Sequence, residues 1–140
     1  MSWVKTYNLY LAWLVALIAV GGSLWFSEVA GYVPCELCWY QRILMYPLAL
    51  ILGIASYRGD RSVTSYALPF SIIGAGVSLY HYAQQKVPGL AEVAGCTQGV
   101  PCSGQYINWL GFITIPFLAL TAFILILSLL WIGLPRSGLR

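Results

Sequence analysis

Charge is the property that this sequence most clearly lacks. Only 8% of its 140 residues are charged, and it contains four acidic residues and a single histidine. Soluble domains carry about a quarter charged residues, so the composition argues against a soluble protein. The seven basic residues are scattered and form no patch suited to nucleic acid. The sequence also shows no phosphate-binding glycine-rich loop, no hydrolytic triad and no paired carboxylates, and one histidine argues against a histidine-based metal site.

Long apolar runs take the place of charge. A helix that crosses a bilayer needs about 20 apolar residues, and we expect four such spans within a single domain of residues 1–140. The first run is longer than the apolar core of a signal peptide, which is about 7–15 residues, so we expect an uncleaved membrane helix. The predicted fold is an all-α membrane protein with a four-transmembrane-helix bundle. The expected spans are about 7–26, 39–57, 63–82 and 106–134.

Small residues in the third run favour close packing between helices. The run carries Ser71, Gly74, Ala75 and Ser78. Small side chains let the backbones of membrane helices approach one another. We therefore expect close packing between the third helix and its neighbours.

The basic residues predict the orientation of the bundle. Four spans place both termini on one side, together with an inner loop at 58–62, and leave outer loops at 27–38 and 83–105. The side with the termini would hold five basic residues and the other side only two. Because basic residues favour cytoplasmic loops, both termini are predicted to be cytoplasmic. All four cysteines would then face the oxidising, extracytoplasmic side. The five basic residues are Lys5, Arg58, Arg61, Arg136 and Arg140.

The first cysteine pair, Cys35 and Cys38, is separated by two residues and directly precedes an apolar run. Arg42 follows four residues later, so in a helix Cys38 and Arg42 lie one turn apart on one face. A helix N-terminus and a nearby cation favour the thiolate form of cysteine. A stabilised thiolate makes the corresponding disulfide a stronger oxidant, so this pair is predicted to be redox-active.

The second pair, Cys96 and Cys102, spans a segment with Gly99 and Pro101 that lets the chain turn back. Alone, this pair is best interpreted as a static loop disulfide. With another pair on the same side, thiolate attack would allow the two disulfides to exchange. Two alternatives stay open, which are a structural or binding protein with static disulfides and a zinc site made of four cysteines.

Arg42 and His81 are candidates for binding an electron acceptor. Arg42 would bring a permanent charge and fixed hydrogen-bond donors close to Cys38. A quinone dissolved in the bilayer could reach this depth, and its carbonyl groups need donors. His81, near the outer end of the third run, could help with protons. Gln41 is interpreted as a solvated interface residue rather than a general base.

These features resemble the DsbB-type thiol–disulfide oxidoreductases. The resemblance rests on the four spans, on the outer Cys-x-x-Cys with an arginine four residues on, and on the second outer cysteine pair. The run from Cys35 to Ile43, with Met45, Tyr46 and Pro47, is similar to the short BdbC branch of that family.

The resemblance implies an enzyme of the bacterial plasma membrane that supports disulfide formation in exported proteins. It would reoxidise a DsbA-like thioredoxin-fold thiol oxidase and pass electrons to a membrane quinone, menaquinone or ubiquinone. By the same resemblance Cys38 faces the quinone beside Arg42, and Cys35 is its more accessible mate. Cys96 would be attacked by the reduced partner, and Cys102 would exchange with Cys35.

Overall fold

The computed structural model describes residues 2–31, 36–86 and 115–134, and this part of the chain is helical with no strand. Four of its helices are long and apolar enough to cross a membrane. The predictions of an all-α fold and of four spans are therefore confirmed. The helices are α1 (Ser2–Leu24), α2 (Glu36–Arg58), α3 (Thr64–Lys86) and α5 (Ile115–Ile132).

Two short helical segments complete the described chain. A π-helix, η1 (Trp25–Val29), continues α1, and a 3₁₀ helix, η2 (Arg61–Val63), leads into α3. Between α2 and η2 the chain turns at Gly59, whose φ of 67° lies in the left-handed region that glycine enters without a steric penalty. Asp60 then caps η2 by accepting a hydrogen bond from the backbone N–H of Ser62.

The first three long helices extend beyond the apolar runs from which they were predicted, whereas α5 ends at Ile132, before the expected end at 134. The outer loop expected at 27–38 is too long, since η1 continues to Val29 and α2 begins at Glu36. Likewise α3 continues to Lys86, beyond the expected end at 82. Polar residues can extend a helix past the apolar layer, because its backbone hydrogen bonds do not depend on side-chain polarity. Residues 106–114 of the expected fourth span lie outside the described residues.

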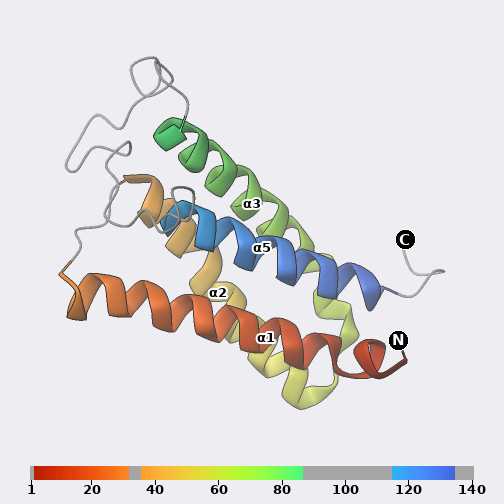
Figure 1. The fold of residues 1–140 in the computed structure, drawn as a ribbon. Helices are drawn as coiled ribbons and strands as arrows, with labels where there is room; N and C mark the ends of the chain where they lie inside the picture. Colours follow the sequence, from red (N-terminus) through yellow and green to blue (C-terminus); the bar gives the residue numbers. More distant parts are fainter. Residues whose placement is uncertain (1, 32–35, 87–114, 135–140) are drawn as a thin grey trace.

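The four long helices form an antiparallel bundle (Figure 1), in which α1 and α3 each pack against both α2 and α5. The start of α1, the α2–α3 connection and the end of α5 lie at one end of the bundle. The end of η1, the start of α2 and the end of α3 lie at the other. This arrangement brings the first turn of α2, with Cys38, beside the last turns of α1.

Close packing holds the bundle together, because lipid is as apolar as the core and gives little hydrophobic driving force. Leu48 and Leu52 of α2 and Ile126 and Leu130 of α5 are fully buried. The small residues of α3 pack closely, as expected, since Ser71, Gly74 and Ser78 are buried and Ala75 is partly buried against the core. A Cβ atom on Gly74 would lie only 2.2 Å from a ring carbon of Phe123.

Candidate functional site

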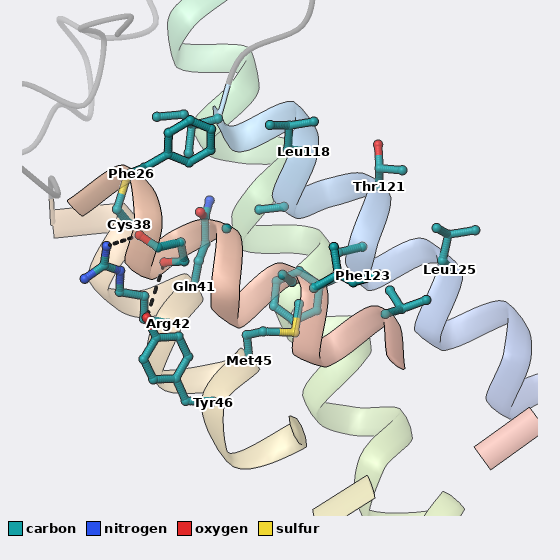
Figure 2. A pocket seen from close by; sticks show the side chains of 18 of the residues that line it. Phe26, Cys38, Gln41, Arg42, Met45, Tyr46, Leu118, Thr121, Phe123 and Leu125 are labelled. Carbon is teal, nitrogen blue, oxygen red and sulfur yellow. Dashed lines mark hydrogen bonds between the residues drawn. The ribbon is translucent and has the colours of Figure 1, made fainter. Parts of the chain in front are cut away.

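An apolar cleft of about 390 Å³ lies between α1, α2 and α5, near the end of the bundle that carries Cys38. Most of its wall is aliphatic or aromatic, including Phe26, Met45, Leu118 and Phe123. Polar side chains of α1, η1 and α2 also line it (Figure 2), and these are Ser23, Ser27, Cys38, Gln41, Arg42 and Tyr46. The cleft therefore combines an apolar wall with sulfur, cationic and hydroxyl groups.

Cys38 is half-buried in the first turn of α2, and its side chain lines the cleft. At this position the helix dipole favours a negative charge. Cys38 therefore lies near a helix N-terminus, as predicted. Cys35, Cys96 and Cys102 lie outside the described residues.

Arg42 lines the same cleft one turn further along α2, and it is held from the side of α1. Its Nη2 donates a hydrogen bond to the backbone carbonyl of Ser23 at 3.1 Å and another to the hydroxyl of Ser27. Its guanidinium carbon also lies 5.2 Å from the ring centroid of Trp39, within cation–π range. These contacts fix the charge of Arg42 at the polar part of the cleft wall (Figure 2).

The last turn of α1 and the adjoining η1 supply the two oxygen acceptors for Arg42. Ser23 and Ser27 are four residues apart, so they lie on one face of the helix. The hydroxyl of Tyr46 donates to Ser23 Oγ at 3.4 Å and adds a second link between α1 and α2. Ser27 belongs to η1, and π-helical turns are rare and are often found at functional sites.

His81 is buried, with 1% of its surface exposed, and it contacts the cleft wall through Gln41. The amide nitrogen of Gln41 lies 3.2 Å from Nδ1 of His81, and Gln41 is one of the residues that line the cleft. His81 itself is not one of them. The interpretation of Gln41 as a solvated interface residue is wrong, because its face of α2 points inward and only 6% of it is exposed.

The described residues contain no group of three or more His, Cys, Asp or Glu side chains that could hold a metal ion. Three of the four cysteines lie outside them, so the alternative of a four-cysteine zinc site stays a hypothesis.

The sequence did not predict the hydrogen-bond partners of Arg42. Ser23 and Ser27 have a visible helical spacing, but that spacing alone does not identify a partner on another helix.

The chain is similar to known disulfide bond formation proteins. Residues 5–133 match the family described as "Disulfide bond formation protein DsbB". The chain is 67% identical over 119 residues to "Disulfide bond formation protein C" of Bacillus subtilis strain 168. The aligned region covers 85% of this chain and 86% of that protein.

Two further relatives carry similar names. A "Probable disulfide formation protein C" of Halalkalibacterium halodurans is 58% identical and covers 87% of this chain and 90% of its own length. A "Probable disulfide formation protein" of Coxiella burnetii is 50% identical and covers 85% of this chain and 82% of its own length. No solved structure matches the chain. With four helices able to span a membrane and a family match over nearly its whole length, the chain belongs to the DsbB family of disulfide bond formation proteins.

Proposed function

We propose that this disulfide-forming membrane protein oxidises a reduced, DsbA-like thioredoxin-fold partner and passes the electrons to a membrane quinone. The observation that carries the proposal is that Cys38 and Arg42 open onto one apolar cleft between membrane helices. A redox-active sulfur, a fixed cation and an apolar cavity are the three features that electron transfer to a lipid-soluble acceptor needs.

The residues of the cleft fit a quinone. Its volume of about 390 Å³ falls within the range of about 300–1,000 Å³ that is usual for small-molecule sites. Arg42 would hold a carbonyl oxygen, while Met45, Leu118 and Phe123 would contact the ring. A bound quinone would supply the capacity to accept two electrons and two protons.

The chain's own groups would divide the remaining work. The start of α2 and the charge of Arg42 would stabilise the thiolate of Cys38. The Gln41–His81 pair would hold a polar group behind the cleft, where a proton could be donated or accepted. His81 would thus act through Gln41 rather than by direct contact with the acceptor.

The proposed thiol–disulfide exchange uses all four cysteines. A thiolate of the partner would attack Cys96 of a Cys96–Cys102 disulfide and release Cys102 as a thiolate. The partner's second thiol would then release Cys96 by forming the partner's own disulfide. The reduced loop pair would in turn reduce a Cys35–Cys38 disulfide through attack of Cys102 on Cys35. In each round two thiols become one disulfide, and two electrons move toward Cys38. We place these cysteines on the extracytoplasmic side because of the distribution of basic residues.

The test is turnover in a reconstituted membrane. The purified protein in lipid vesicles receives a reduced thioredoxin-fold oxidase and a soluble quinone analogue, and both quinone reduction and partner oxidation are followed. We expect Cys38→Ser to abolish quinone reduction. Ser78→Ala, a buried substitution on α3 outside the cleft, is a control that should retain it.

Two results would contradict the proposal. Quinone reduction at the full rate in Cys38→Ser would exclude Cys38 as the electron donor. A non-reducing peptide map of the wild-type protein that stays unchanged after addition of the reduced partner would favour static disulfides instead.

A further inference from the structure

A second hollow, of about 460 Å³, lies at the end of the bundle opposite Cys38. It is formed where the start of α1 meets the α2–α3 connection (Figure 1). Among the residues that the structure describes, its wall contains one cation, two phenols and no acidic side chain. The lining residues are Tyr7, Leu9, Tyr10, Ser56, Gly59 and Arg61.

The cation of this hollow, Arg61, is anchored by a buried amide. Its Nη1 donates a hydrogen bond to Oδ1 of Asn8 at 3.1 Å, and only 1% of the surface of Asn8 is exposed. The amide nitrogen of Asn8 donates in turn to the backbone carbonyl of Leu129 on α5 at 3.2 Å. An arginine that served only to reach water would extend away from the bundle. Arg61 instead lies against α1, where its hydrogen bond to Asn8 holds it, although the residue as a whole is exposed.

The hollow also lies at the depth of the lipid headgroups. The apolar part of α1 begins at Tyr7, and that of α2 ends at Arg58. Tyr7 and Tyr10 are each about half exposed, as is typical of aromatic residues at a membrane interface. The carboxylate of neighbouring Asp60 accepts hydrogen bonds from the N–H and hydroxyl of Ser62. A ligand at this place would meet a fixed positive charge beside phenolic donors.

We propose that this hollow binds the phosphate group of an anionic phospholipid. The forked donors of a guanidinium match phosphate oxygens, and basic pockets between membrane helices are known to suit such headgroups. Arg61 is fixed before the ligand arrives, so binding does not have to order it. A bound headgroup would join α1 to the α2–α3 connection. The inference does not depend on the proposed electron transfer.

The experiment counts lipids on the full-length protein. The protein is placed in nanodiscs that contain phosphatidylglycerol and phosphatidylcholine in equal amounts, and retained lipids are measured by native mass spectrometry. Arg61→Gln is compared with Arg58→Gln, which removes the same charge from the same connection but does not line the hollow. We expect Arg61→Gln to reduce the preference for phosphatidylglycerol about tenfold, as the loss of a charge-assisted hydrogen bond does. Arg58→Gln should have no more than the roughly fivefold effect of one surface charge.

Equal losses in the two variants would overturn the proposal, because they would show a diffuse attraction between basic residues and the membrane. A second experiment compares inorganic phosphate with short-chain phosphatidylglycerol. If millimolar phosphate protects the detergent-solubilised protein against thermal unfolding as well as short-chain phosphatidylglycerol does, the site binds a free anion and the lipid assignment is wrong.

A second variant covers the case in which Arg61→Gln impairs folding, since it removes a donor from buried Asn8. Tyr10→Phe removes one phenol from the hollow and keeps the ring, whose centroid lies 5.8 Å from that of Trp13. Its thermal unfolding in pure phosphatidylcholine should equal that of the wild type, while its retention of phosphatidylglycerol falls. Unchanged retention in a folded Tyr10→Phe variant would overturn the proposal.

Discussion

Replacing Ser27 by alanine should loosen Arg42 without touching the thiol chemistry. The substitution removes one of the two oxygen acceptors of the guanidinium and leaves the carbonyl of Ser23 and the ring of Trp39 in place. A hydrogen bond to a charged group contributes about 1.5–3 kcal/mol. Because the other contacts remain, the lower figure of about 1.5 kcal/mol applies, and it corresponds to about tenfold in an equilibrium constant.

The expected result is a rise of about tenfold in the apparent KM for the soluble quinone analogue. The kcat at saturating quinone and the KM for the reduced partner should stay within about twofold of wild type, since the lost interaction positions the acceptor in ground and transition states alike. Both constants are obtained from steady-state quinone reduction in vesicles. Ser27→Thr, which keeps a hydroxyl group, should restore the affinity.

A matched control comes from the opposite wall of the cleft. Thr121 also lines the cleft, but its hydroxyl donates to the carbonyl of Phe117 on its own helix, at 2.9 Å. Thr121→Ala should therefore leave the KM for quinone near its wild-type value. A Ser27→Ala variant with unchanged quinone dependence, or one no more affected than Thr121→Ala, would refute the role given to the end of α1.

Three further predictions concern stability. Gln41→Leu leaves the single histidine, which is buried, without its amide neighbour, and it should lower the free energy of unfolding by about 1–3 kcal/mol in denaturant titration. Gly74→Ala places a Cβ atom 2.2 Å from an aromatic carbon of α5 and should cost about 1–3 kcal/mol through overpacking. Gly76→Ala, whose Cβ would meet no described atom within 4 Å, should be neutral or stabilising. The hydroxyl and N–H of Ser62 lower the pKa of Asp60 from 3.8. This small stabilisation of the folded state is present above pH 3.8 and is lost as the pH falls through the lowered pKa. Asp60→Ala should therefore weaken the loss of thermal stability at acid pH.

The sequence by itself determined the class of the protein. The four spans follow from apolar length, because a bilayer admits only segments that satisfy their own backbone hydrogen bonds. The shared face of Cys38 and Arg42 follows from the helical repeat, and both residues line one cleft. The close packing of α3 also follows from its small residues, since Ser71 and Ser78 are both fully buried. These features depend on neighbours within a single segment.

Only the tertiary structure decided which side chains meet across helices. The helices are apolar over most of their surface, so hydrophobic periodicity does not reveal which face points inward. For that reason Gln41 could not be assigned to a buried contact with His81 from its position in the chain. Likewise, the hydrogen-bond partners of Arg42 on α1 and η1, Ser23 and Ser27, lie 19 and 15 residues away in the sequence. Their meeting depends on the rotation and spacing of two packed helices, which long-range packing determines and local sequence does not.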